Sequence, residues 1–181
     1  MITAPLRVTE DARHYRIDPL TLRRWRGMIL PAKLTMRTLH TSYRVSNLSA
    51  SLDFYTALGY TQVGRVDLGG GASLTMLNFP GEEVVTLELV HRPAAGAVDI
   101  GTGFSHIPGQ VDDLPATLGR LSEAGLKPGP VERPGGQDGP QISWLTDPDG
   151  YRIELVQWPP GHPYGITAAD FQYESGREPR N

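Results

Sequence analysis

The feature that most constrains the fold is an internal repeat. When the chain is shifted against itself without a gap so that His40 falls on His106, Glu88 falls on Glu154. Apolar, helix-capping and glycine positions coincide at the same offset: Val45 with Val111, Asn47 with Asp113, Leu48 with Leu114, Leu52 with Leu118, Gly59 with Gly125, and Leu89 with Leu155. Because matched residues have the same structural roles, we expect one supersecondary unit to occur twice.

The pattern within each copy predicts a strand, a helix and three further strands. An extended segment opens each copy, at 39–45 and 105–111, and a helix follows that ends at a glycine. The helix caps are Ser46 or Asn47 in the first copy and Asp112 or Asp113 in the second. Strand-like runs separated by Gly- and Pro-containing turns come next. Each copy therefore reads βαβββ.

The predicted fold class is α+β, with two tandem βαβββ modules at residues 38–92 and 103–157. One helix covers only one face of a four-stranded sheet, so we expect the modules to form a curved mixed sheet around a shared site. Residues 1–33 carry seven Lys and Arg against three acids. We expect 1–35 to be a basic, poorly ordered extension, 36–158 the main domain, and 159–181 a C-terminal arm.

Composition excludes several function classes. The chain has 17 Lys and Arg, 20 Asp and Glu, a formal charge of −3 and no cysteine. This balance disfavours nucleic-acid binding, and the absence of cysteine excludes thiolate metal sites and cysteine nucleophiles. No apolar run suits a membrane span or a signal peptide, so we expect no membrane partner and a cytoplasmic location.

The repeated His and Glu residues are the candidate site. Glu88 and Glu154 each lie between apolar strand residues, where a carboxylate is costly to bury unless it is paired or bound to a metal. The separation along the chain from His40 to Glu88 equals that from His106 to Glu154. Two His and two Glu that converge would hold one divalent metal, such as Zn, Ni, Co, Mn or Fe, and leave positions open for substrate.

The motifs around these residues resemble those of glyoxalase I, of the vicinal-oxygen-chelate (glyoxalase, bleomycin resistance and dioxygenase) superfamily. The similarity extends from about Thr38 to Gln157 and is carried by LHTSYRV at 39–45, SLDFY at 51–55, LEL at 87–89, GFSHI at 103–107 and DPDGYRIEL at 147–155. It implies paired βαβββ modules and a metal held by His40, Glu88, His106 and Glu154. It also implies a homodimer in which two chains can form each site jointly.

The resemblance further implies a reaction. The hemithioacetal of methylglyoxal and a low-molecular-weight thiol would be isomerised to a lactoyl thioester on a Ni, Co or Zn ion. Glu154 would be the principal base, Glu88 the second carboxylate ligand and partner in proton transfer, and Arg44 the substrate-binding residue that pairs with a carboxylate of the thiol. Arg92 stands where the family usually has a glutathione-binding Asn, and the glycine-rich segment 132–138 has no Lys. Glutathione or another thiol is therefore the expected partner.

Other chemistries remain as alternatives. One is a different vicinal-oxygen-chelate enzyme, an epimerase or a dioxygenase, and the other is a non-catalytic small-molecule binding protein similar to bleomycin-resistance proteins. A Ser105–His106 nucleophile pair is not expected, because adjacent strand residues point to opposite faces of a sheet.

Overall fold

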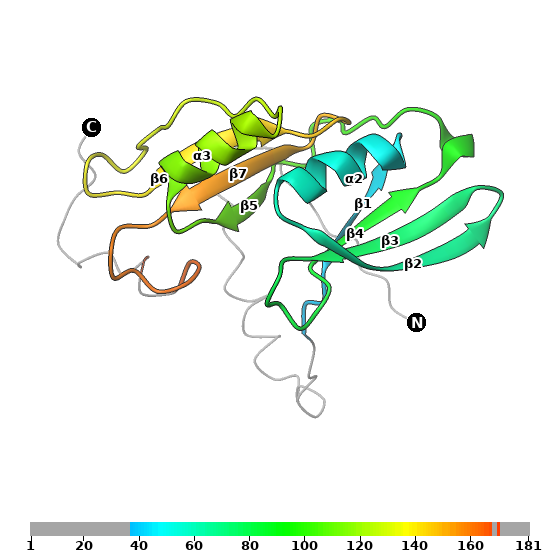
Figure 1. Ribbon diagram of the computed structural model, residues 1–181, viewed down its shortest axis with the longest axis horizontal. Coiled ribbons are helices and arrows are strands. Elements are labelled where there is room, and N and C mark those ends of the chain that lie inside the picture. Colours follow the sequence, from blue (N-terminus) through cyan, green and yellow to red (C-terminus); the bar gives the residue numbers. More distant parts are fainter. Residues whose placement is uncertain (1–36, 168–169, 171–181) are drawn as a thin grey trace, which may run out of the picture. The chain divides into compact units, whose positions relative to one another are not determined.

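The computed structural model describes residues 37–167 and Asp170. The first module contains β1 (Thr41–Val45), α2 (Leu48–Ala57), β2 (Thr61–Gly69), β3 (Ala72–Asn78) and β4 (Leu87–His91). A short 3-10 helix, η1 (Pro93–Ala95), leads to the second module, which contains β5 (Ile107–Gln110), α3 (Leu114–Glu123), β6 (Gln141–Thr146) and β7 (Arg152–Gln157). The order of elements confirms the predicted α+β class with a helix after the first strand of each module (Figure 1).

Each module forms a mixed sheet of its own. The strand orders are β1-β4-β3-β2 and β5-β7-β6. In both sheets the first strand of the module runs parallel to the last, and the remaining pairs are antiparallel. The last strand of each module, which carries the repeated Glu, therefore lies between two neighbours.

The second module departs from βαβββ at one strand. Where the first module has β2, the second has only an isolated antiparallel bridge between Glu132 and Ile142. Pro128, Pro130 and Pro134 surround this bridge. Proline has no N–H to donate to a ladder, so the segment cannot extend into a full strand.

The helices begin and end as the sequence predicts. Asn47 Oδ1 accepts a hydrogen bond from Ala50 N (3.2 Å), and Asp113 Oδ1 accepts one from Ala116 N (2.9 Å). Gly59 and Gly125 follow the helices with φ angles of 110° and 86°. These angles favour glycine, which lacks the Cβ that would clash there.

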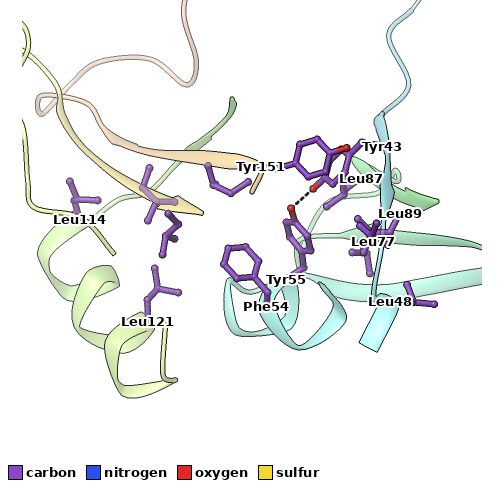
Figure 2. Packing of buried hydrophobic residues seen from close by; sticks show 14 residues of the cluster. Tyr43, Leu48, Phe54, Tyr55, Leu77, Leu87, Leu89, Leu114, Leu121 and Tyr151 are labelled. Carbon is purple, nitrogen blue, oxygen red and sulfur yellow. Dashed lines mark hydrogen bonds between the residues drawn. The ribbon is translucent and has the colours of Figure 1, made fainter. Parts of the chain in front are cut away.

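Aromatic and aliphatic side chains from both modules share one core (Figure 2). The ring centroids of Tyr43 in β1 and Tyr151 before β7 are 4.4 Å apart. The Tyr43 hydroxyl donates to the Tyr55 hydroxyl, which in turn donates to Asp147 Oδ2 over 3.0 Å. A polar chain within an apolar core thus joins the two modules.

The C-terminal segment contacts the second module through β5. Gly165 N donates to Gln110 Oε1 over 3.0 Å, and the His162 ring stacks on Trp158 at a centroid distance of 4.2 Å. The predicted basic extension, residues 1–35, lies outside the described residues, and the domain limits expected at residues 35 and 158 stay predictions. In the described part of the chain, no helix combines the length and apolar character needed to span a bilayer.

Candidate metal and substrate site

His40 and Glu88 form the pair of the first module. His40 directly precedes β1, and Glu88 is the second residue of β4, which runs parallel to β1. His40 Nε2 lies 3.9 Å from Glu88 Oε2, and the side chains are 28% and 15% exposed. Ser42 Oγ donates to the other oxygen, Glu88 Oε1, over 2.6 Å. The carboxylate therefore directs one oxygen to a hydroxyl and one to an imidazole.

His106 and Glu154 form the equivalent pair of the second module. His106 directly precedes β5, and Glu154 lies in β7, which runs parallel to β5. His106 Nε2 lies 3.2 Å from Glu154 Oε2. The His106 ring meets the Trp144 ring edge-on at 5.2 Å, and the Arg152 guanidinium lies 3.9 Å above the same ring. An aromatic ring thus forms one wall beside this pair.

The structure places the four repeated residues in two separate pairs, His40 with Glu88 and His106 with Glu154. Each His lies next to the Glu of its own module. Among residues 37–167 and 170, however, no three His, Cys, Asp or Glu side chains gather in a metal-binding cluster. Within one chain, each module therefore offers half of a four-residue set.

The position of the two His residues differs slightly from the sequence prediction. Both were expected on a first strand, but each is the residue immediately before it. The first ladder bond of β1 is made by Thr41 N to Thr86 O, so His40 stands outside the hydrogen-bonded register. Because neither His belongs to a strand, the alternation of side chains between the two faces of a sheet does not fix the direction of its imidazole.

This position makes one sequence prediction wrong. Ser105 and His106 were expected to point apart, yet Ser105 Oγ lies 2.8 Å from His106 Nδ1. Both residues precede β5, where the alternation rule does not apply. The contact occupies Nδ1 and leaves Nε2 directed at Glu154, which is how an outer hydrogen bond orients a ligating His.

Arg44 lies on β1, two residues after Ser42 and on the same face. Its guanidinium donates from Nη1 to Gly96 O (2.7 Å) and from Nη2 to Ala97 O (2.6 Å). These bonds attach the segment between the modules to β1. Arg44, the residue predicted to bind substrate, therefore also holds the segment between the modules in place.

The donor chemistry of the two pairs fits a divalent metal. Imidazole nitrogen and carboxylate oxygen bind such metals at about 2.0–2.2 Å, so two donors on one ion lie roughly 3–3.5 Å apart. The 3.2 Å between His106 and Glu154 falls in this range, whereas the 3.9 Å between His40 and Glu88 exceeds it slightly.

Ser42, Ser105 and Trp144 were not identified from the sequence. Ser42 meets Glu88 only through the parallel register of β1 with β4, which pairs the two residues. Trp144 faces Glu154 only through the register of β6 with β7, which pairs the two residues. No local motif encodes that register.

Comparisons with known proteins show which family shares this sequence and fold. Residues 37–155 match the family model described as Glyoxalase/Bleomycin resistance protein/Dioxygenase superfamily. A lactoylglutathione lyase from Neisseria meningitidis serogroup A is 37% identical over 131 residues, which cover 67% of this chain and 91% of the relative.

Two solved structures share the fold. A glyoxalase I variant from Zea mays superimposes with a TM-score of 0.60 and 28% identity over 67% of this chain and 45% of the maize chain, so this chain spans less than half of it. The glyoxalase I of Leishmania major, described as trypanothione-dependent, has a TM-score of 0.55 and 26% identity over 68% of this chain and 87% of its own.

Proposed function

The chain belongs to the Glyoxalase/Bleomycin resistance protein/Dioxygenase superfamily, and we propose that it is a metal-dependent lyase of the glyoxalase I type. It converts the hemithioacetal of methylglyoxal and a low-molecular-weight thiol to a lactoyl thioester, and its relative from Neisseria meningitidis is named a lactoylglutathione lyase. The observation that carries this proposal is the pair of equivalent His–Glu sets, one in each module, at the same place relative to the parallel strands.

His40, Glu88, His106 and Glu154 are the proposed ligands of one divalent metal. Since the two pairs do not gather within the described part of one chain, we assign the complete site to a homodimer, in which one chain supplies His40 and Glu88 and its partner supplies His106 and Glu154. A two-fold dimer would then contain two such sites. Ni, Co and Zn are the proposed metals, because all three accept nitrogen and oxygen donors with open positions.

Glu154 is the proposed base. When bound, the metal supplies a Lewis acid that polarises the two vicinal oxygens of the hemithioacetal. The Glu154 carboxylate takes the proton from the carbon that bears the sulfur and the hydroxyl, and returns it to the neighbouring carbonyl carbon. The C–H bond at the first carbon breaks and a new one forms at the second, while the hydroxyl proton of the first carbon passes to the oxygen of the second, which leaves a thioester and a secondary alcohol. The two His residues and Glu88 keep their places throughout.

The thiol of the substrate is recognised through its carboxylate. Arg44 is our proposed contact for a thiol carboxylate, through guanidinium donors not engaged by Gly96 and Ala97. Arg92 and the absence of Lys from segment 132–138 depart from the family pattern for glutathione. The Leishmania relative, described as trypanothione-dependent, supports testing more than one thiol. A cytoplasmic location stays a proposal as well.

Turnover by metal-stripped protein tests this function. The chain is stripped with a chelator, and Ni, Co, Zn or Mn is added back separately before thioester formation from methylglyoxal is followed with glutathione or with trypanothione. We expect turnover to return with at least one metal and one thiol. Replacing Glu154 with Gln should lower kcat by at least about 100-fold, within the range of general base catalysis, while Glu123→Gln at the end of α3 serves as the matched control. Activity of Glu154→Gln equal to the control would contradict the assigned base.

A further inference from the structure

The two half-sites differ at one repeat position. Ser42 in β1 pairs in register with Glu88, and Pro108 in β5 pairs in register with Glu154. Ser42 and Pro108 are themselves counterparts at the repeat offset that places His40 on His106. The same place beside each carboxylate thus holds a hydroxyl donor in one module and a residue without a hydroxyl or an N–H in the other.

This difference changes what restrains each carboxylate. The Ser42 hydroxyl holds Glu88 Oε1 over 2.6 Å, the short distance typical of an O–H bond to an ionised carboxylate, while Oε2 faces His40. The Glu154 carboxylate lies 3.2 Å from His106 Nε2 through Oε2, and no hydroxyl or backbone N–H donates to it within the described part of the chain. To swing away from its position, Glu88 would have to break the bond from the Ser42 hydroxyl as well as leave its His, whereas Glu154 would leave only its His.

We infer that Ser42 is a positioning residue that keeps Glu88 as a fixed metal ligand, so that proton transfer falls to Glu154 alone. The inference rests on the proposed function, because it assigns roles within the proposed metal site. A carboxylate bound to a hydroxyl is oriented as a ligand in the way that outer hydrogen bonds orient metal ligands generally. A base must instead reach the substrate carbon, and Glu154 has no bond from a hydroxyl to break before it moves.

The metal affinity of the full-length protein is the primary test. Ni and Zn dissociation constants are measured for metal-stripped wild type, Ser42→Ala and Ser42→Thr by competition with a chromophoric chelator. We expect Ser42→Ala to weaken affinity by about 10-fold or more, as loss of an outer hydrogen bond to a ligand does. Ser42→Thr should restore affinity to within about threefold, because threonine keeps the hydroxyl.

Thr41→Ala is the matched control, since it removes the hydroxyl of the neighbouring exposed residue from the opposite face of β1. Its affinity should equal that of wild type. The melting temperatures of metal-stripped Ser42→Ala and Thr41→Ala should agree, which separates a role in metal orientation from a role in folding. Wild-type affinity in Ser42→Ala, or failure of Ser42→Thr to restore it, would overturn the role of Ser42.

Pro108→Ser is the reciprocal test, because it places a hydroxyl beside Glu154. We expect kcat to fall by about 10-fold with no loss of metal affinity, since the base becomes restrained while the ligand set stays complete. An unchanged kcat would overturn the assignment of proton transfer to an unrestrained Glu154.

Failure of the proposed function gives a different pattern from failure of this inference. If wild type binds metal tightly but produces no thioester with any thiol, the function fails while the affinities of the Ser42 variants still decide the role of Ser42. If wild type binds no divalent metal, both are wrong.

Discussion

The Tyr55 hydroxyl donates to Asp147 Oδ2 over 3.0 Å and so joins α2 of the first module to the turn between β6 and β7 of the second. Asp147 is 4% exposed, and its Oδ1 accepts hydrogen bonds from the backbone N–H groups of Asp149 and Tyr151. Burial raises the pKa of the Tyr55 hydroxyl well above its usual range, so it stays a donor at neutral pH. The junction between modules therefore depends on a satisfied buried carboxylate.

Replacing Tyr55 with Phe should destabilise the protein. The substitution removes a donor to Asp147 and leaves the apolar ring in place, so the free energy of unfolding should fall by about 1–3 kcal/mol, the cost of an unsatisfied buried polar group. Chemical denaturation of the metal-stripped protein measures this change. Tyr164→Phe is the control, because Tyr164 is 82% exposed. Equal stabilities of the two variants would show that the bond contributes nothing.

The pH dependence of the free energy of unfolding should show that the pKa of Asp147 is raised in the folded protein. Burial raises the pKa of its carboxyl, against the opposing effect of the Tyr151 N–H and the Tyr55 hydroxyl. Because the folded state holds the proton more tightly than the unfolded chain, the stabilising contribution of this group is complete below the unfolded pKa of about 3.9 and decreases as pH rises through the folded pKa.

Asp147→Asn tests this sign, because the amide does not titrate in this range. The free energy of unfolding of wild type minus that of the variant should decrease from about pH 4 to about pH 7. The difference removes contributions from the other titrating groups. A difference that is constant or increases with pH would mean that the Asp147 pKa is not raised.

Replacing Thr75 with Val should stabilise the protein. Thr75 in β3 is fully buried, and its hydroxyl has no hydrogen-bond partner in the described part of the chain. Valine has a similar shape, so the variant should gain about 1 kcal/mol by removing an unsatisfied polar group. The midpoint of denaturation measures the gain, and Thr56→Val on the exposed face of α2 is the control. A loss of stability would indicate that the Thr75 hydroxyl is hydrated or bonded in solution.

Mixing two inactive variants tests the joint site. One variant carries His40→Ala with Glu88→Gln, and the other carries His106→Ala with Glu154→Gln, so each alone should be inactive. After co-refolding, random pairing should make half of the dimers mixed, each with one intact site, and restore about a quarter of wild-type turnover. No recovery in a confirmed mixed dimer would mean that the four ligands do not assemble between chains.

Local features were predictable from the sequence. Asn47, Asp113, Gly59 and Gly125 act on a helix only a few residues away, so their identity and spacing were sufficient. The repeat also predicted that His40, Glu88, His106 and Glu154 would converge on one point. Within the described part of the chain, each His contacts only the Glu of its own module.

The sequence by itself determined the fold class, the repeated modules and the four candidate ligands, because periodicity, caps and matched spacing are encoded along the chain. Only the tertiary structure decided that the candidate ligands lie in pairs among the described residues, that Ser42 donates to Glu88, and that Tyr55 reaches Asp147. Tyr55 and Asp147 are 92 residues apart. Such contacts depend on strand register and on the packing of separate modules, which no local pattern specifies.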